Sequence, residues 1–440
     1  MSAPADDGRI PFGVKALLAA LGLSAFAVVG QITIIGKQVY DLTGSTLDLG
    51  LLGLAEFIPV ALLSPFTGTT ADRFDRRKVY AAGLAGEAAT SFALFLYIRN
   101  DPTDVWPIFV LVAAFGVARA FVSPASRALP IDLSPPSVLE RVIALRSVAF
   151  QLGIITGPVI AGFVFVLGPE YPYVLAMAAF GLAAAMLLLV PKPGTDRLRS
   201  VSGGRQVLRD ALEGLRFVRR EPVVLGAISL DLFAVLFGSA VALLPAIAED
   251  RLGVGAVGLG WLRAAVGIGA GVTAVALAVR PVRRHIGPVL FAVITVFGVG
   301  TILIGLSTSY TVIFVALFVI AAADSISMYI RASLVPLATP ENMRGRVLAV
   351  ENVFIGASNE LGAVESGLAA YFLGLVGAVV TGGIGTLVVV ALWWRWFPEL
   401  RAIDRFADVR FQGATGGAVG SADGRDVSSE GVRHDRRAGG

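Results

Sequence analysis

The segment TADRFDRRKV at residues 70–79 carries seven polar or charged side chains, six of which are ionisable. It separates two long apolar runs, at residues 49–66 and 79–98. The hydrocarbon core of a membrane is about 30 Å thick, and a helix needs about 20 apolar residues to cross it. The segment therefore has the position of a short polar loop between two membrane-spanning helices.

The composition of the whole chain agrees with this interpretation. Hydrophobic residues make up 56% of the 440 residues and charged residues only 15%, whereas about 25% of the residues are charged in a typical soluble domain. Apolar runs of sufficient length recur twelve times, which predicts an all-α integral membrane protein with twelve transmembrane helices. The expected spans lie near residues 13–36, 48–70, 79–98, 105–124, 142–166, 172–190, 223–247, 256–279, 288–307, 310–332, 347–374 and 376–397.

Several kinds of site lack the residues they need. The chain has no cysteine, and its two histidines are His285, in an expected loop, and His434, near the C-terminal end. Thiolate ligands, histidine metal clusters and histidine-dependent catalytic triads therefore find almost no residues from which to form. We expect no metal, no cofactor and no enzymatic activity.

The basic residues are distributed unevenly across the membrane. If alternate loops lie on one side, 31 of the 36 lysines and arginines fall on the side of the 70–79 loop, with both termini. The other five are Lys37, Arg99 and Arg251 on the opposite side and Arg119 and Arg263 within spans. Basic loops mark the cytoplasmic side, so we expect both termini in the cytoplasm and the chain in the inner (plasma) membrane. The net charge of +4 then reflects topology and not a nucleic-acid partner.

An internal repeat relates the two halves of the chain at a spacing of 205 residues. The segment PPSVLERVIAL at residues 135–145 overlays PENMRGRVLAV at residues 340–350. The matched pairs are Pro135 with Pro340, Arg141 with Arg346, Val142 with Val347, Gly157 with Gly362 and Gly162 with Gly367. Each half therefore contributes six spans in the same order, which predicts two pseudo-symmetric six-helix bundles with a site between them.

A polar linker joins the two bundles. Within it, residues 206–218 place apolar side chains mostly on one helical face with arginines around them, as in an amphipathic helix at a membrane surface. After Pro398 the apolar pattern stops, and the composition becomes that of a disordered segment. The expected regions are an N-terminal bundle at 1–190, a cytoplasmic linker at 191–221, a C-terminal bundle at 222–397 and a disordered cytoplasmic tail at 398–440.

The 70–79 loop and its flanks have the form Gly-x-x-x-Asp-Arg-x-x-Arg-Arg, given by Gly68, Asp72, Arg73, Arg76 and Arg77. This pattern resembles the cytoplasmic loop motif of the major facilitator superfamily, although an aspartate, Asp75, stands where that motif has its second glycine. The resemblance implies that the loop stabilises one access state of a transporter. A loop that only sets the membrane topology is the alternative.

Span 5 contains the sequence GIITGPVIAG, with Gly153, Gly157, Pro158 and Gly162. It resembles an element of antiporters of the same superfamily, and small residues allow helices to approach closely. We interpret the element as an interface on which the bundles rock. Ordinary packing of small residues is the alternative.

Longer stretches, above all residues 323–367, resemble the branch of the superfamily that contains bacterial enterobactin exporters. The resemblance covers nearly all of residues 12–397. It implies a monomeric secondary exporter in the lipid bilayer that moves a small molecule, a siderophore or a drug-like compound, by alternating access with proton antiport. An import-type or uncoupled facilitator, a channel and a lipid-moving protein are the alternatives.

Ionisable side chains inside spans are costly unless they are paired or face water, so each is a functional candidate. Without a histidine in a span, a carboxyl group must carry the coupled proton, and the candidates are Asp324, Asp231 and Glu360. Glu87 and Arg119 lie at similar depths and are expected to form a structural pair. The candidates for lining a substrate cavity are Gln31, Glu56, Arg119, Arg263, Arg331, Asn359 and Glu365, and buried pairs that only lock helices together are the alternative.

The expected topology can be tested with reporter fusions. Reporters placed after Pro136, Ser200 and Gly420 should report the cytoplasm, and reporters near Asp101 and Pro169 the outer side. Alkaline phosphatase and fluorescent-protein fusions measure the two locations. An outer location at Ser200 would contradict the arrangement of six spans on each side of the linker.

Overall fold

A computed structural model describes residues 10–192 and 204–409, and this part of the chain is helical with no strand. The helices of the first half are α1 (Phe12–Thr43), α2 (Thr46–Arg73), α3 (Arg76–Ile98), α4 (Trp106–Leu133), α5 (Leu139–Phe165) and α6 (Tyr171–Met186). Those that follow are α7 (Gly204–Arg220), α8 (Pro222–Phe237), α9 (Leu244–Ala246), α10 (Gly255–Val279), α11 (Ile286–Leu306), α12 (Tyr310–Leu337), α13 (Arg344–Trp396) and α14 (Pro398–Arg401).

The described helices provide the twelve expected spans. Eleven of the described segments are long and apolar enough to cross a membrane, and one of them, α13, has 53 residues. Gly374 interrupts α13 with φ 73° and ψ 166°, so α13 consists of two helices that each form a span. Glycine is suited to this break because a positive φ is strained for residues with a Cβ atom. The twelve-helix fold predicted from the sequence is therefore confirmed.

Span 7 is not a single helix. After α8 ends at Phe237, the chain continues through a 3-10 turn at Ala240–Leu243, the short α9 and a π-helical turn, η4, at Ile247–Arg251. Interrupted helices of this kind occur in transporters where backbone groups line a site, and π-helical turns are found frequently at functional sites. This irregular end of span 7 meets the first half of the chain.

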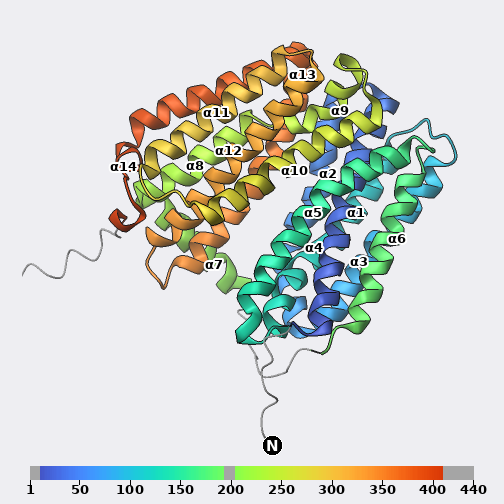
Figure 1. Ribbon diagram of the computed structural model, residues 1–440, viewed down its shortest axis with the longest axis horizontal. Helices are drawn as coiled ribbons and strands as arrows, with labels where there is room; N and C mark the ends of the chain where they lie inside the picture. Colours follow the sequence, from blue (N-terminus) through green and yellow to red (C-terminus); the bar gives the residue numbers. More distant parts are fainter. Residues whose placement is uncertain (1–9, 193–203, 410–440) are drawn as a thin grey trace, which may run out of the picture.

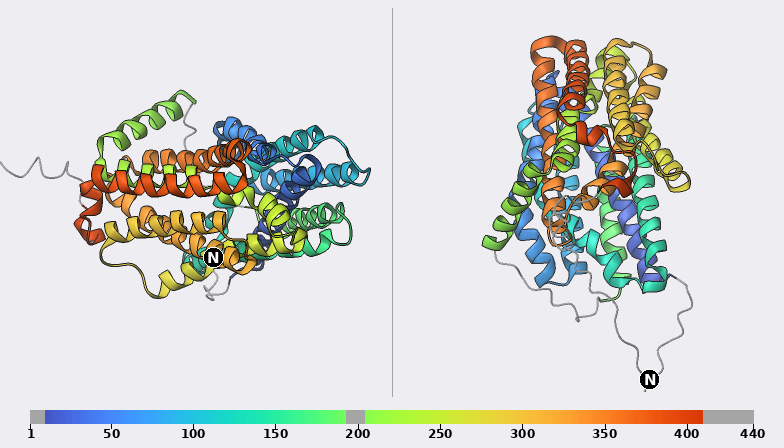
Figure 2. Two further views of the ribbon diagram at one scale, coloured as in Figure 1. Left: turned by 90° about the horizontal axis from the view of Figure 1, so that it is seen from above. Right: turned by 90° about the vertical axis from the view of Figure 1, so that its left-hand side faces the viewer.

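The helices form two bundles, α1–α6 and α8–α13, whose axes converge toward the end at which α9 lies (Figure 1). We call this the opposite end; it holds the loops at 44–45, 99–105, 166–170, 252–254 and 307–309. We call the other end, with the loops at 74–75, 134–138, 280–285 and 338–343, the basic end. Two helix pairs, α5 with α10 and α2 with α13, form the main contacts between the bundles, and Figure 2 shows the bundles from two further directions.

Glycines allow the backbones of these helix pairs to touch. A Cβ atom on Gly162 of α5 would lie 2.5 Å from the carbonyl oxygen of Ala256 in α10, and one on Gly367 of α13 would lie 2.7 Å from that of Thr46 in α2. No real side chain fits at these distances, so the close approach depends on glycine. Both contacts are near the opposite end, where the bundles are therefore held together.

Helix α7 packs on the basic end of the second bundle. Its side chains Asp210 and Glu213 lie 3.0 Å and 2.7 Å from guanidinium nitrogens of Arg346 at the start of α13. On the same side of the helix, Val218 is buried against α8 and α13. Part of the apolar face of α7 is thus covered by the protein itself.

The tail predicted to be disordered from residue 398 is folded in its first part. Leu400 is buried, and Ile403 packs in the same apolar cluster against α8, α11 and α12. The side chain of Asp404 accepts hydrogen bonds from the backbone N–H of His285 at 3.0 Å and from Arg284 at 3.1 Å. These contacts satisfy amide groups before the first turn of α11. The remainder of the predicted tail, 410–440, lies outside the described residues.

The hydrogen bonds of Asp404 make the stability of the folded segment 398–409 depend on pH. The hydrogen bond from the His285 backbone and the guanidinium of Arg284 hold the pKa of Asp404 below its usual range. A carboxyl group with a lowered pKa in the folded state stabilises the fold above its unfolded pKa and loses this effect as the pH falls through its folded pKa. We expect faster hydrogen–deuterium exchange of residues 398–409 in Asp404→Asn at pH 7. In the unaltered chain, the protection of these amides relative to their intrinsic exchange rates should fall under acidic conditions.

The matched control is Glu399→Gln, which removes an exposed carboxylate from the same segment. It should leave the exchange unchanged. Equal exchange in Asp404→Asn and the unaltered chain at pH 7 would show that Asp404 does not hold the segment in place.

Candidate functional site

The second bundle buries an arginine among carboxyl groups, which we call the Arg331 cluster. Nη2 of Arg331 in α12 lies 2.8 Å from Oδ1 of Asp231 in α8, and Nη1 lies 3.6 Å from Oε1 of Glu351 in α13. Asp324, two turns from Arg331 on α12, interacts electrostatically with Asp231 and Arg331. Arg331 is 3% exposed and Asp231 is 4% exposed, so this ion pair is buried, whereas Asp324 is half-exposed.

The first bundle contains a comparable group, which we call the Arg119 cluster. Nε of Arg119 in α4 lies 3.2 Å from Oε1 of Glu56 in α2. Glu87 of α3 is 0% exposed, and neither of its carboxyl oxygens has a hydrogen-bond partner among the described residues. The predicted Glu87–Arg119 pair is therefore wrong: the guanidinium is held by Glu56, because α2 and α4 approach closely where Gly116 touches the backbone of Glu56.

Glu360 of α13 joins the Arg119 cluster from the other bundle. Its Oε2 lies against Gly53 of α2, at the place where a Cβ atom would stand, and it interacts electrostatically with Glu56 and Arg119. This cluster therefore contains one arginine and three carboxyl groups, as the Arg331 cluster does. It also spans the contact between the two bundles.

The internal repeat relates the two clusters. The offset of 205 residues carries Arg119 onto Asp324, on the equivalent helices α4 and α12. A basic residue in one half thus corresponds to an acidic residue in the other. The two halves share their backbone architecture, but their charges at this position are opposite.

The remaining candidates for a substrate cavity lie outside these ion pairs. Gln31 is 1% exposed and accepts a 2.5 Å hydrogen bond from Ser91, one turn from Glu87 on α3. Arg263 has no ion pair within the described residues, and its Nε is buried without a hydrogen-bond partner. The Asn359 amide donates to Ile355 of its own helix. Glu365 is half-buried, and its carboxylate accepts a 3.5 Å hydrogen bond from the Ser366 hydroxyl.

The loop between α2 and α3 is fastened within the first bundle. Arg76 lies 2.5 Å from Asp132 of α4, and Arg77 donates to the carbonyl oxygen of Val190 at 2.6 Å. Asp75 accepts from the side chain and backbone of Arg77, and the side-chain contact holds its pKa below the usual range. Its φ of −60° explains why an aspartate can replace the glycine: here it begins a helix. Arg73 is exposed, and the side-chain positions of Gly68 and Asp72 lie outside the described structure.

The small residues of span 5 face two different helices. Gly153 and Gly157 lie against the α1 backbone within the first bundle. The carbonyl oxygen of Pro158 touches Gly260, and Gly162 faces Ala256, both on α10 of the second bundle. The element therefore holds α5 to its own bundle on one side and forms the contact between bundles on the other.

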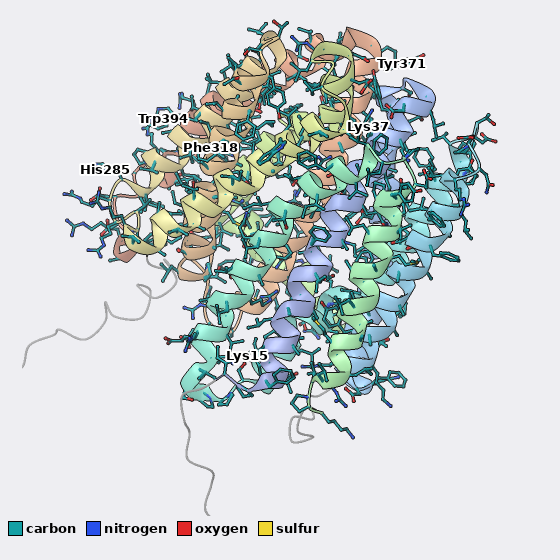
Figure 3. All side chains as sticks on the ribbon, turned by 45° about the vertical axis from the view of Figure 1, so that its right-hand side comes forward. Lys15, Lys37, His285, Phe318, Tyr371 and Trp394 are labelled. Atoms are coloured by element: carbon teal, nitrogen blue, oxygen red, sulfur yellow. The ribbon has the colours of Figure 1, made fainter. Side chains whose placement is uncertain are left out.

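Charged side chains join the bundles at the opposite end, in a group we call the latch. Nζ of Lys37 in α1 lies 2.8 Å from Oδ1 of Asp41 and 2.9 Å from Oε2 of Glu249 in η4. The hydroxyl of Tyr40 donates to Asp250, the next residue of η4. Figure 3 shows Lys37 and Lys15 near the two ends of α1. Sequence reasoning counted Lys37 only as a loop charge, and nothing in the local pattern indicates a partner 212 residues away.

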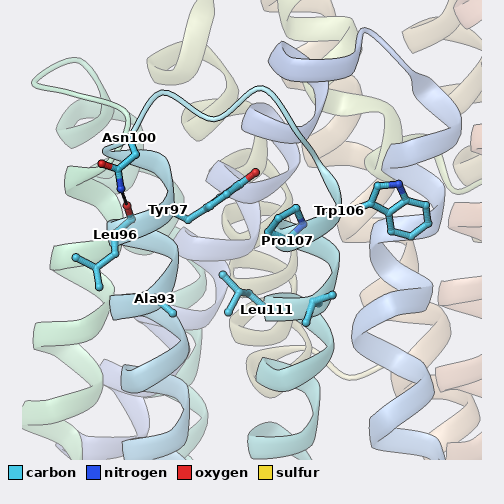
Figure 4. A pocket seen from close by; sticks show the side chains of 8 residues that line it. Ala93, Leu96, Tyr97, Asn100, Trp106, Pro107 and Leu111 are labelled. Atoms are coloured by element: carbon cyan, nitrogen blue, oxygen red, sulfur yellow. Dashed lines mark hydrogen bonds between the residues drawn. The ribbon is translucent and has the colours of Figure 1, made fainter.

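A shallow apolar groove of about 630 Å³ lies elsewhere, between α3 and α4 near the opposite end. Figure 4 shows Leu96, Tyr97, Pro107 and Leu111 around it, with the side-chain amide of Asn100 bound to the carbonyl oxygen of Leu96. The groove contains no charged side chain. None of its lining residues belongs to either cluster.

Two related six-helix bundles with arginine and carboxyl groups in their interiors define a membrane transporter that carries substrates between two halves. The family model described as Major Facilitator Superfamily matches residues 16–363, so the chain belongs to that superfamily. Families of this kind are transporters and not enzymes.

Several characterised or named members are similar to the chain. The uncharacterized MFS-type transporter YfiS of Bacillus subtilis is 24% identical over 86% of this chain and 92% of its own length. The enterobactin exporter EntS of Escherichia coli is 25% identical, with coverages of 87% and 90%. The multidrug efflux pump Tap of Mycolicibacterium fortuitum is 27% identical, with coverages of 82% and 90%.

The fold also matches solved structures. A bacterial homolog of the human lysosomal transporter Spinster, described as inward-facing and unoccupied, superposes with a TM-score of 0.68. The match covers 91% of this chain and 98% of the homolog, at 15% identity. At that identity the similarity concerns the fold alone.

The latch predicts which change should separate the bundles at the opposite end. Lys37→Gln removes the charge shared by Asp41 and Glu249, and an interaction of about 1 kcal/mol shifts an equilibrium roughly fivefold. Because the chain lacks cysteine, spin labels can be attached at Thr103→Cys and Thr308→Cys, on exposed loops of the two halves. Double electron–electron resonance spectroscopy should show a larger population of long distances between the two labels.

Arg99→Gln is the matched control. It removes a cation from the same end. The Arg99 guanidinium lies over the ring of Phe95 in the first bundle, so among the described residues it does not connect the two bundles. The distances should then stay as in the unaltered chain. If Lys37→Gln also leaves them unchanged, the latch does not contribute to holding the bundles together.

Proposed function

We propose that the chain is a secondary active exporter that moves a small molecule, a siderophore or a drug-like compound, out of the cell by alternating access and proton antiport. It acts as a monomer in the inner (plasma) membrane with both termini in the cytoplasm. The basic end then faces the cytoplasm, which the excess of lysine and arginine in its loops supports.

The observation that carries the proposal is the charge balance of the Arg331 cluster. Three carboxyl groups, of Asp231, Glu351 and Asp324, share one guanidinium within the membrane-spanning region. Uncompensated negative charge is costly there because little water is available to solvate it. The cluster therefore gains stability by binding a proton, which is the property that an antiport site requires.

Within the cluster, Asp324 is the group that we expect to exchange the proton. Asp231 and Glu351 each have an arginine nitrogen within 4 Å, whereas the Asp324 carboxylate has no ion pair or hydrogen bond with any other described residue. Its side chain is also half-exposed, unlike those of its buried neighbours. A proton bound at Asp324 removes one of the two negative charges that Arg331 leaves uncompensated.

The contacts between bundles support alternating access. Glycine contacts and the latch join the halves toward the opposite end, and Glu360 reaches across to the Arg119 cluster near the middle. Opening toward the outer side requires these contacts to separate while others form at the basic end. Arg263, which has no ion pair within the described part of the chain, is available to a negatively charged part of a substrate.

The choice of an exported small molecule rests on relatives. EntS is named as an enterobactin exporter and Tap as a multidrug efflux pump, and each is similar over more than four fifths of this chain. A screen in an export-deficient strain should compare enterobactin, erythromycin and ethidium, with and without an uncoupler of the proton gradient. The compound whose uncoupler-sensitive efflux rises is then used in proteoliposomes.

The coupling role of Asp324 predicts a separation of two activities. Asp324→Asn mimics the protonated carboxyl group and cannot release a proton. We expect normal insertion and retained exchange of the chosen compound down its gradient, but at least a roughly tenfold loss of uphill transport driven by a pH gradient, equivalent to about 1.4 kcal/mol. Both rates can be measured in the same proteoliposomes.

Asp104→Asn, the same substitution in an exposed loop, is the control and should leave both rates unchanged. If uphill transport persists in Asp324→Asn, the proton site lies elsewhere, and Asp231 and Glu360 are the next candidates. If the unaltered protein moves the compound equally well without a gradient, it is an uncoupled facilitator and the proposed antiport is wrong.

A further inference from the structure

The environment of Glu87 differs from that of every other carboxyl group in the two clusters. Its side chain is fully buried, and both of its oxygens lack a hydrogen-bond donor within the described part of the chain. An ionised carboxylate in such a place would lose its hydration without compensation. A neutral carboxylic acid avoids most of this cost.

The surrounding charges do not favour an ionised Glu87. Arg119 of α4 is the nearest cation that acts on it, but that guanidinium already lies 3.2 Å from Glu56 of α2, and Glu56 adds a negative charge nearby. On α3 itself, Tyr80 lies two turns away toward the basic end and is fully buried, with Arg146 of α5 acting on it from beyond. The side chain of Gln31 on α1 is neutral.

The last helix packed against α3 brings no charge. The helix α6 has no acidic or basic side chain in its sequence. Among the residues that the structure describes, Glu87 therefore has one counter-ion, Arg119, and it shares that counter-ion with Glu56. Whichever of the two carboxyl groups Arg119 contacts is stabilised as the ion, and the other is left without compensation.

We propose that Glu87 is a second proton-binding group, neutral while Arg119 is paired with Glu56, and that Arg119 changes partner from Glu56 to Glu87 when Glu87 releases its proton. In this step the O–H bond of the Glu87 carboxyl group breaks and the proton passes to water. The guanidinium keeps all of its protons throughout.

The partner change links the proton to the contact between bundles. Glu360 reaches the Arg119 cluster from α13, and it interacts with both Glu56 and Arg119. When Arg119 turns toward Glu87, the negative charge of Glu56, which faces Glu360 across the interface, is no longer compensated. Repulsion between Glu56 and Glu360 then weakens the α2–α13 contact. This inference extends the proposed proton coupling to the first bundle, but its test does not depend on transport.

Infrared spectroscopy of the full chain in lipid nanodiscs tests the protonation directly. A neutral carboxylic acid has a carbonyl stretching band that a carboxylate lacks, and the band shifts in heavy water. We expect Glu87→Gln to remove one such band at pH 7. Glu140→Gln, which changes an exposed glutamate at the basic end, should remove none. An unchanged spectrum for Glu87→Gln would show that Glu87 is ionised and would overturn the proposal.

The change of partner has a separate test that leaves Glu87 in place. Glu56→Gln frees Arg119, so Glu87 should ionise against it, and the Glu87 band should disappear at pH 7 and return at lower pH. In the double variant Glu56→Gln/Glu87→Gln the band should be absent at every pH. If the band persists at pH 7 in Glu56→Gln, Arg119 does not change partner. The Glu56→Gln variant also tests whether Glu87 binds a proton if Glu87→Gln fails to fold.

Discussion

Charge inside a membrane-spanning bundle must be compensated locally, because neither water nor salt is available to screen it. The Arg331 cluster follows from this constraint. Its arginine on α12 contacts carboxyl groups on α8 and α13, and these three helices form one side of the second bundle. The cluster holds three carboxyl groups and one guanidinium, and this imbalance is the basis of the proton binding that we propose.

The first bundle meets the constraint in a different way. Arg119 pairs with Glu56, Glu87 remains buried without a partner, and Glu360 arrives from the other bundle. The repeat places Arg119 and Asp324 at equivalent positions with opposite charges. Two related six-helix halves therefore need not carry equal sites. In this protein one half provides a cluster closed within its bundle, and the other a cluster shared across the interface.

Close approach of the bundles depends on residues without side chains. Gly162 and Gly367 allow the backbones of facing helices to touch near the opposite end. The latch of Lys37 and Glu249 lies at the same end, on the irregular final turns of span 7. A regular helix would carry Glu249 at a different angle, so the interruption after Phe237 and the latch are parts of one arrangement.

The sequence determined the spans, their order and the division into two related halves, because the length of an apolar run and the spacing of a repeat are local properties. It also indicated which charges lie inside spans. It could not show which charges meet: Asp231 and Arg331 are 100 residues apart, and only the packing of α8 on α12 places them 2.8 Å apart. The Glu87–Arg119 pair was wrong because equal depth does not fix the rotation of a helix. Tertiary structure alone decides that rotation, since it depends on contacts such as Gly116 against Glu56 that involve both helices at once.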